Sequence, residues 1–189
     1  MTWTDLPADL PVPVDDGAAD HLQGTRVPAI ELAATDGRKV RLDTLQGRTV
    51  VYAYPRTGEP GKPSLVEDWD QIPGARGCTP ESCGFRDHHA ELQAAGAGVY
   101  GLSTQDTAYQ QEAATRLGLP FPLLSDERLE LTGALRLPTF EAAGLTLLKR
   151  ITLLLDRGTI ERVWYPVFPP DAHAEEVLAW LKEHPARRG

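Results

Sequence analysis

The sequence has no long apolar run and no basic run, and these two absences narrow what the protein can do. No apolar stretch approaches the roughly 20 residues that a helix needs to cross a bilayer, so we expect no membrane span. The formal net charge is -8, and Arg187-Arg188 at the end of the chain is too short to form a basic patch. We therefore expect no nucleic-acid partner and no membrane partner.

Cysteine is also scarce, because the chain contains only Cys78 and Cys83. The first residues lack the basic and apolar segments of a secretory signal, so we expect a cytoplasmic protein. In that compartment a stable structural disulfide is unusual. A close cysteine pair there is more often catalytic, redox-sensing or metal-binding.

The composition that remains suits one α/β domain. With 189 residues, 41% of them hydrophobic and 24% charged, the chain is long enough to bury a sizeable core. Residues 1–23 are polar and proline-rich, and we expect them to pack loosely on the surface as an extension. Residues 24–185 form the predicted domain, and residues 186–189 form a tail.

Hydrophobic patterns predict the order of the elements. Alternating residues on both sides of Asp36-Gly37 predict a β-hairpin, and the apolar run 49–54 predicts a buried central strand. Further strands are predicted at 99–103, 121–124, 146–156 and 159–165. Helices are predicted at 80–95, 106–117 and 129–135, and after a cap at Asp171. This order predicts three layers with a central mixed sheet.

Both cysteines lie where a helix is predicted to begin. A glycine-rich turn leads into Cys78, Thr79 is a candidate cap, and Pro80 suits a first helical position. Backbone N–H groups at a helix start stabilise a thiolate, and Arg76 and Arg86 are close in sequence. We therefore expect the pKa of Cys78 to fall below its ordinary value, as in a reactive cysteine.

A long loop joins the central strand to this helix. Residues 56–77 lack apolar periodicity and contain several prolines and glycines. A loop of this length inside a compact domain is usually functional or disordered, and its position favours a functional one. Trp69 and Ile72 are the residues expected to hold it against the domain.

These features resemble the peroxiredoxins, and most closely the Q-type group, also called bacterioferritin-comigratory proteins. Residues 77–87 are similar to the Gly-Cys-Thr-x-x-x-Cys-x-x-Arg-Asp run of that group. Other similar runs occur, in order, at residues 27–28, 35–37, 51–56, 119–126 and 150–156. The resemblance extends from residue 27 to residue 181. It implies a thioredoxin-like fold and a thiol-dependent peroxidase that reduces hydrogen peroxide and organic hydroperoxides.

The resemblance also implies roles for individual residues. Cys78 would be the peroxidatic nucleophile, and Cys83 would resolve it by forming an intramolecular disulfide. Arg150 matches the active-site arginine, and Glu81 stands where many members carry a glutamate that orients it. Gly77, Cys78 and Arg150 would bind the substrate. No cofactor or metal is implied, the reductant would be thioredoxin or a similar dithiol, and the protein would be a monomer.

One departure from the family pattern concerns its Pro-x-x-x-Thr-x-x-Cys motif. Ala75, not threonine, lies three residues before Cys78. An insertion at about residues 58–74 accounts for this, because the sequence on both sides of it matches. Pro55 then corresponds to the family proline and contributes to substrate binding, and Thr57 is the candidate for the hydroxyl.

The spacing of the cysteines has a geometric consequence. Five residues along a helix rise about 7.5 Å, whereas a disulfide requires Cα atoms within about 7 Å. The first turns of the helix must therefore unwind before the bond closes. We expect residues 80–84 to be helical in the reduced protein and not in the oxidised one.

Other interpretations remain open at this point. The cysteines could be buried structural thiols, or they could form a zinc site with His88 and His89, although the spacing does not match usual zinc sites. A redox-sensing or binding module could use the pair as a switch that oxidises once, where a peroxidase turns over.

Structural roles are also the alternatives for individual residues. Arg150 could be a surface charge, Thr57 a turn residue and Glu81 a partner of the helix dipole. Pro138 is expected to be a plain loop proline. The histidines expected on the surface are His21, His173 and His184.

Overall fold

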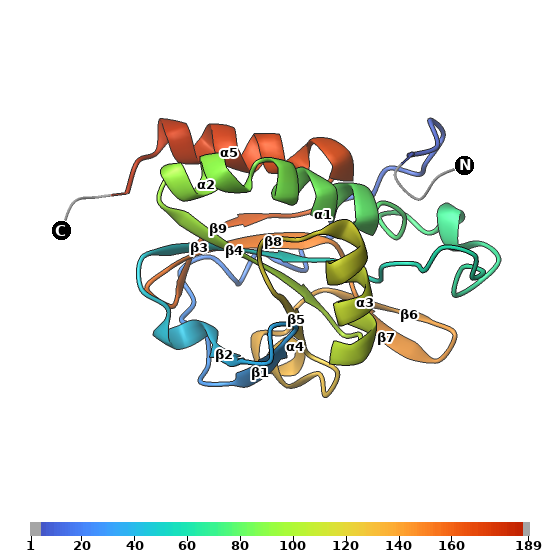
Figure 1. Ribbon diagram of the computed structural model, residues 1–189, viewed down its shortest axis with the longest axis horizontal. Coiled ribbons are helices and arrows are strands. Elements are labelled where there is room, and N and C mark those ends of the chain that lie inside the picture. The colour runs from blue at the N-terminus through green and yellow to red at the C-terminus, as the bar shows by residue number, and fades with distance from the viewer. Residues whose placement is uncertain (1–4, 187–189) are drawn as a thin grey trace.

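The computed structural model describes residues 5–186, so the expectations for residues 1–4 and for Arg187-Arg188 lie outside it. Seven strands form one mixed sheet in the order β2-β1-β5-β4-β3-β8-β9 (Figure 1). Its strands are β1 (Glu31–Ala34), β2 (Lys39–Arg41), β3 (Arg48–Ala53), β4 (Ala97–Ser103), β5 (Leu123–Ser125), β8 (Ile151–Asp156) and β9 (Thr159–Trp164). The predicted hairpin and central strand are confirmed, because β1 pairs antiparallel with β2 and β3 lies between β4 and β8.

The central strand β3 is buried on both faces, and its side chains alternate between two cores. Val50 and Tyr52 enter one hydrophobic cluster, whereas Val51 and Ala53 enter the other. Because every position of this strand is buried, the strand appears in the sequence as an unbroken apolar run. The strand thus gives the chain that follows it a rigid base.

Helices cover the sheet on both faces. α1 (Cys78–Asp87), α2 (His89–Ala94) and α5 (His173–Glu183) lie on one side of the strands, and α4 (Glu130–Leu135) lies on the other (Figure 1). α3 (Thr107–Leu117) packs on β5 and contacts α1. Asp106 caps α3 by accepting a hydrogen bond from the Tyr109 amide at 2.8 Å, as its sequence predicts.

Two predicted helices differ from those observed. The helix expected at 80–95 begins two residues earlier and breaks at His88, whose ψ of 7° separates α1 from α2. The cap expected at Asp171 is also wrong. That residue lies in a 3-10 turn, η3 (Pro170–Ala172), and no side chain caps α5.

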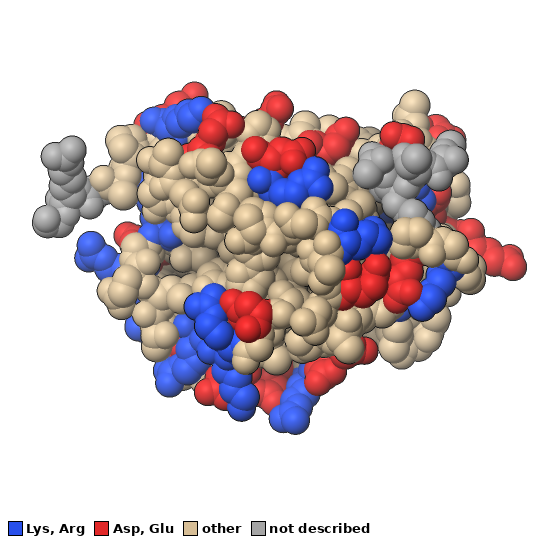
Figure 2. All heavy atoms as spheres, in the orientation of Figure 1, with Lys and Arg blue, Asp and Glu red and all other residues tan. Residues whose placement is uncertain are grey.

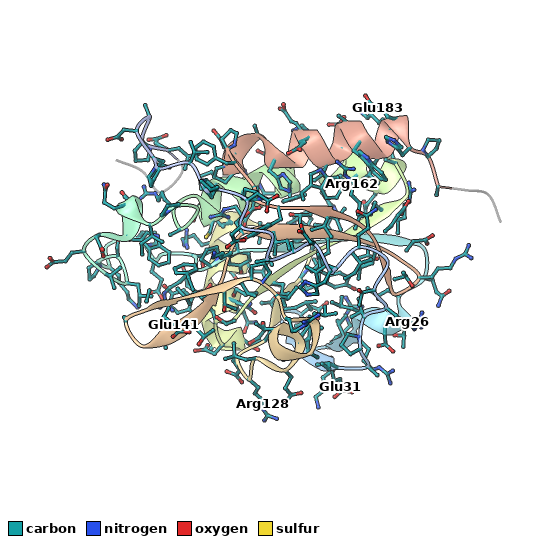
Figure 3. The ribbon with its side chains drawn as sticks, turned by 180° about the vertical axis from the view of Figure 1, so that it is seen from behind. Arg26, Glu31, Arg128, Glu141, Arg162 and Glu183 are labelled. Atoms are coloured by element: carbon teal, nitrogen blue, oxygen red, sulfur yellow. The ribbon has the colours of Figure 1, made fainter. Side chains whose placement is uncertain are left out.

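A second β-hairpin was not predicted. The segment expected as one strand at 146–156 is divided into β7 (Leu145–Leu148) and β8, and β7 pairs with β6 (Thr139–Ala142) just after Pro138. This hairpin projects from the body of the molecule, and Figure 3 shows Glu141 on it. The sequence does not predict it because β6 has only one buried residue, Ala142, and only Lys149 and Arg150 separate the apolar residues of β7 from those of β8.

The loop before α1 packs against this hairpin. Trp69, at the start of η2 (Trp69–Gln71), forms a small hydrophobic cluster with Ala142 and Leu147. Its ring centroid lies 6.2 Å from that of Phe140. Trp69 therefore holds the loop before α1 in place, as its sequence predicts.

The N-terminal segment is bound more firmly than expected. Leu22 is fully buried and joins the cluster that also holds the α4 side chains. Asp16 accepts hydrogen bonds from Lys149 and Tyr165, both at 2.7 Å.

Figure 2 shows acidic and basic side chains interspersed on the face that it presents. Within residues 5–186, no helix is both long and apolar enough to cross a membrane.

Candidate active site

A glycine, not a polar cap, sets the start of α1. Gly77 has φ of 112°, and a Cβ atom there would lie 2.3 Å from Cγ of Pro170. Only glycine fits both the backbone and the space. Cys78 follows as the first residue of α1 and is buried, and Thr79 lies inside the helix, so its predicted capping role is wrong.

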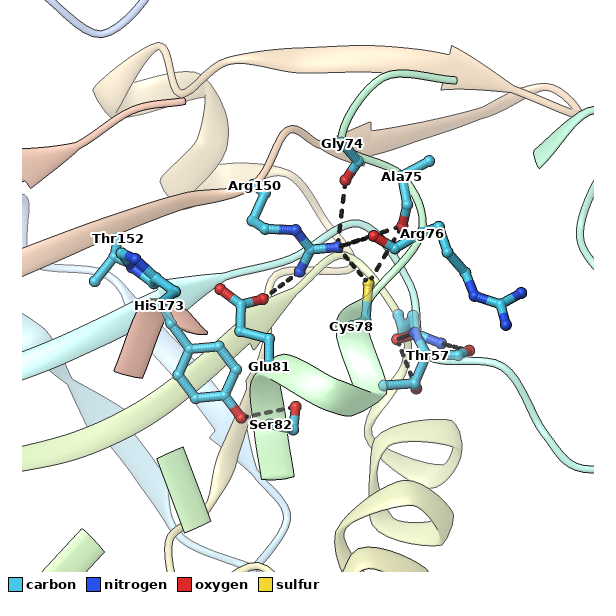
Figure 4. Close-up of polar contacts among 12 residues, drawn as sticks. Thr57, Gly74, Ala75, Arg76, Cys78, Glu81, Ser82, Arg150, Thr152 and His173 are labelled. Atoms are coloured by element: carbon cyan, nitrogen blue, oxygen red, sulfur yellow. Dashed lines mark hydrogen bonds and ion pairs between the residues drawn. The ribbon is translucent and has the colours of Figure 1, made fainter. Parts of the chain in front are cut away.

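Arg150 binds the sulfur of Cys78 directly. The residue precedes β8 and is 3% exposed, so it is not a surface charge. Its Nη2 lies 3.3 Å from the Cys78 Sγ (Figure 4). The same nitrogen lies 3.2–3.3 Å from the carbonyl oxygens of Gly74, Ala75 and Arg76. The end of the loop before α1 thus curls around the guanidinium that contacts the thiol.

Glu81 completes this buried group from α1. Its Oε2 accepts a hydrogen bond from Nη1 of Arg150, and both side chains are almost wholly inaccessible. Because Glu81 lies one helical turn after Cys78, the two residues reach the same guanidinium. A buried carboxylate and guanidinium stabilise each other, so removing one leaves the other as an unpaired buried charge.

The electrostatics of Cys78 differ from the sequence-based expectation. Burial raises the pKa of the Cys78 thiol above its ordinary value, and Arg150 together with a backbone hydrogen bond from Arg56 acts against that rise. The nearby Glu81 carboxylate adds to the rise. The sulfur also lies 3.6 Å from the Ala75 carbonyl, to which a protonated thiol donates. The pKa of Cys78 is therefore raised in this conformation, not lowered as expected, because Arg150 and the backbone hydrogen bond do not outweigh burial.

Thr57 lies beside Cys78 after the end of β3. Its side chain is 1% exposed and lines the same cavity as the cysteine. The Thr57 amide and hydroxyl lie 3.2 and 3.3 Å from Oε1 of Gln105, to which both can donate. A hydroxyl that donates to Gln105 keeps its lone pairs for a donor in the cavity. Thr57 is thus placed at the cavity beside Cys78, and its role there stays a prediction.

The cavity beside Cys78 has a volume of about 350 Å³. Gly77, Cys78 and Thr57 line it, whereas Pro55 and Arg150 do not. Six further lining residues come from the loop before α1: Gly58, Lys62, Pro63, Ser64, Leu65 and Trp69. The lining also contains Arg56 and Arg76 and no aspartate or glutamate.

Cys83 lies later on the same helix and is partly exposed. Both cysteines are free thiols, so the structure contains the helical form expected of the reduced protein. Among residues 5–186, no three histidine, cysteine, aspartate or glutamate side chains converge to hold a metal ion. His88 lies 3.0 Å from Glu91 and His89 packs on Phe121, which does not favour the zinc interpretation.

Two residues near the site were missed or misplaced. Gln105 was missed, although it follows β4 and Thr57 follows β3, and the ends of adjacent parallel strands meet. His173, expected on the surface, is buried against Phe85 and Trp164. It precedes Val177 by four residues, so the buried stripe of α5 already included it.

The fold and this site define a thioredoxin-like thiol protein whose cysteine begins a helix. The Redoxin family model matches residues 22–178. A solved structure of peroxidoxin BcpB from Mycobacterium tuberculosis superposes with a TM-score of 0.70 at 27% identity, covering 88% of this chain and 100% of that chain. Peroxiredoxin Q of Xanthomonas campestris, at 24% identity and a TM-score of 0.66, shares the fold.

Sequence relatives specify the family. The chain is 35% identical over 166 residues to peroxiredoxin Bcp of Escherichia coli (strain K12), covering 85% of this chain and 96% of the relative. It is also 35% identical over 162 residues to peroxiredoxin Q, chloroplastic, of Oryza sativa subsp. japonica, of which it spans 66%. The chain belongs to the Q-type peroxiredoxins, a family of thiol-dependent peroxidases.

Proposed function

We propose that this chain reduces hydrogen peroxide and bulkier organic hydroperoxides, with Cys78 as the peroxidatic nucleophile. The observation that carries the proposal is the Arg150 Nη2 contact at 3.3 Å from the Cys78 Sγ, beside a cavity open to substrate. Arg150 favours the thiolate, which is the form that attacks.

In the proposed step, the thiolate attacks the terminal oxygen of the peroxide. The S–O bond forms as the O–O bond breaks, so the sulfur is oxidised to a sulfenic acid and the peroxide is reduced. The leaving alkoxide or hydroxide takes a proton and departs as alcohol or water. Gly77 and Cys78 line the cavity where that negative charge develops, and we propose their backbone N–H groups as its donors. The Thr57 hydroxyl donates to Gln105, so in this arrangement it accepts a hydrogen bond from the hydroperoxide O–H.

We propose that Cys83 then resolves the sulfenic acid. Its thiolate attacks the Cys78 sulfur, water leaves, and an intramolecular disulfide forms. Because both sulfurs belong to one helix, the cycle needs no second subunit, and we propose a monomer. A thioredoxin-like dithiol would return both cysteines to thiols, which suits a reducing compartment such as the cytoplasm.

The cavity supports a preference for bulky and anionic hydroperoxides. A volume of about 350 Å³ is that of a small-molecule site, far larger than hydrogen peroxide needs. Leu65, Trp69 and Pro63 provide an apolar wall, and Arg56 lies over the Tyr109 ring at 4.5 Å. Of the three cations in the lining, Lys62 pairs with Glu59 and Arg76 pairs with Asp70 at 3.3 Å. We therefore propose Arg56 as the cation that favours an anionic substrate.

The test is peroxide consumption with thioredoxin, thioredoxin reductase and NADPH. Cys78→Ser is expected to abolish turnover. Cys83→Ser is expected to complete one peroxide reaction and then stop, with Cys78 left as a sulfenic acid that a dimedone probe labels. Full turnover by Cys78→Ser would refute the nucleophile assignment. A wild-type protein that oxidises once, with no turnover, would indicate a redox sensor instead.

A further inference from the structure

His173 is a buried histidine with a polar partner on each ring nitrogen. It is the first residue of α5 and is 1% exposed. Its Nε2 lies 2.8 Å from the Thr152 Oγ1, and its Nδ1 lies 3.1 Å from Oε2 of Glu176. A carboxylate only accepts hydrogen bonds, so Nδ1 carries a proton and donates it. The threonine hydroxyl can donate to Nε2 or accept from it, which lets the ring be neutral or charged.

These contacts connect the elements that carry the catalytic side chains. Thr152 lies two residues after Arg150, at the beginning of β8. The ring of His173 packs edge-on against Phe85 of α1, with ring centroids 5.9 Å apart. α1 is the helix that holds Cys78 and Glu81. His173 therefore joins the strand of Arg150 to the helix of Glu81.

Near His173, two buried acidic groups share one buried guanidinium. Arg150 contacts both the Glu81 carboxylate and the Cys78 sulfur, so one cation serves two groups that carry negative charge when the thiol ionises. Oε1 of Glu81 is buried and has no hydrogen-bond partner among the described residues. Burial raises the pKa of Glu81 above its ordinary value, and Arg150, followed by His173, acts against that rise. Figure 4 shows the four side chains in the order His173, Glu81, Arg150, Cys78.

We propose that His173 is a positioning residue for the peroxidase reaction, which keeps Glu81 ionised and directed at Arg150 so that Arg150 stays on the Cys78 sulfur. The inference rests on the proposed function of Cys78. The charged groups that face the ring are Glu176 on α5 and Glu81 on α1, and Arg162 of β9 acts on Glu176. Replacing His173 should therefore act on Cys78 only through Glu81 and Arg150.

The experiment follows Cys78 by its rate of alkylation with iodoacetamide as a function of pH, in a Cys83→Ser background. His173→Phe keeps the ring packing and removes both nitrogens. It is expected to move the half-maximal pH upward and to lower kcat/KM for hydrogen peroxide in the two-cysteine protein by about tenfold, the equivalent of one hydrogen bond. His173→Gln, which keeps polar partners for Thr152, should restore part of the rate. His184→Phe changes an exposed histidine of the same helix and should alter neither quantity.

A double variant separates positioning from a purely structural role. In a Glu81→Gln background, His173→Phe should no longer move the alkylation profile, because its target is already uncharged. If His173→Phe lowers only the free energy of unfolding and leaves the profile and kcat/KM unchanged, the proposal is wrong. If it does not fold, His173→Gln decides the question on the same two readouts. Because alkylation needs no peroxide, it tests His173 even if the chain does not turn over.

Discussion

Arg150 and Cys78 are held together by a 3.3 Å contact between Nη2 and Sγ, although they lie 72 positions apart in the chain. This contact opposes the burial that raises the pKa of the thiol. Burial and Arg150 thus have opposite effects on the pKa of Cys78, and their balance determines the fraction of Cys78 that is present as the thiolate.

The pH dependence of Cys78 reactivity tests this balance. Because the pKa of Cys78 is raised, its alkylation rate should still be rising above the pH at which an ordinary cysteine, with a pKa of about 8.5, is half ionised. Arg150→Lys keeps a positive charge but loses the planar fork, so the profile should move to higher pH. Arg38→Lys, an exposed arginine of the β1–β2 turn, is the control and should leave it unchanged. A profile centred well below pH 8 in the wild type would contradict the prediction.

The same shift predicts how stability changes with pH. The folded state holds the Cys78 proton more tightly than the unfolded state does. The folded protein therefore loses stability as pH rises from the unfolded pKa through the raised folded pKa. Cys78→Ser should remove that part of the loss, measured by urea unfolding at neutral pH and at pH about 9.5. Equal losses in both proteins would show that Cys78 is not the group responsible.

Gly77→Ala is expected to destabilise the protein through backbone and packing together. The left-handed conformation costs a non-glycine residue about 1–2 kcal/mol, and the new Cβ would lie 2.3 Å from Pro170. Gly118→Ala is the matched control, because Gly118 is also left-handed but has nothing within 4 Å of the Cβ position. Urea unfolding should therefore give a larger loss for Gly77→Ala. Equal losses in the free energy of unfolding would mean that Pro170 moves away from the new Cβ at no energetic cost.

Oxidation should unwind the first turns of α1. Treatment with one equivalent of hydrogen peroxide is expected to increase amide hydrogen exchange across residues 79–83, because Cys83 must leave the helix to reach Cys78. Helix α3, which holds neither cysteine, provides the internal control and should keep its protection. Unchanged exchange in α1 after quantitative disulfide formation would contradict the proposed unwinding.

The loop of residues 56–77 should determine substrate preference. The ratio of kcat/KM for linoleic acid hydroperoxide to that for its methyl ester is expected to exceed one, and Arg56→Gln should reduce this ratio several-fold. Leu65→Ser should lower kcat/KM for cumene hydroperoxide more than for hydrogen peroxide, because the apolar wall contacts only the larger substrate. Lys182→Gln, an exposed lysine on α5 that pairs with Glu91, is the charge control. An acid-to-ester ratio of one in the wild type would exclude a role for the positive lining.

The sequence predicted the strands around the site better than the site itself. Continuous burial of β3 gives an apolar run, and Asp106 and Gly118 mark both ends of α3, so local patterns suffice for these elements. The start of α1 depends instead on Pro170, which is distant in the chain, and the local preference of Thr79 for a cap is overridden. Local patterns carry no information about such long-range contacts.

The chemistry of the site was predicted only in part for the same reason. The resemblance to a family implied that Glu81 interacts with Arg150, and the structure contains this hydrogen bond. It could not indicate that burial outweighs the arginine at Cys78, because desolvation depends on how completely the surrounding elements enclose the sulfur. His173 is misplaced because histidine is a polar residue, although its position on the apolar face of α5 indicates burial.

The close packing of α1 on α5 has a consequence for the driving force of the proposed cycle. A Cβ on Gly84 would lie only 3.4 Å from the Cβ of Ala174, so the reduced helix is held tightly by its neighbour. Every contact that favours this docked helix favours the dithiol over the disulfide, because the disulfide requires the helix to open. About 1.4 kcal/mol of docking energy corresponds to about 30 mV of reduction potential. Tighter docking would therefore slow disulfide formation and make the disulfide a stronger oxidant toward its reductant.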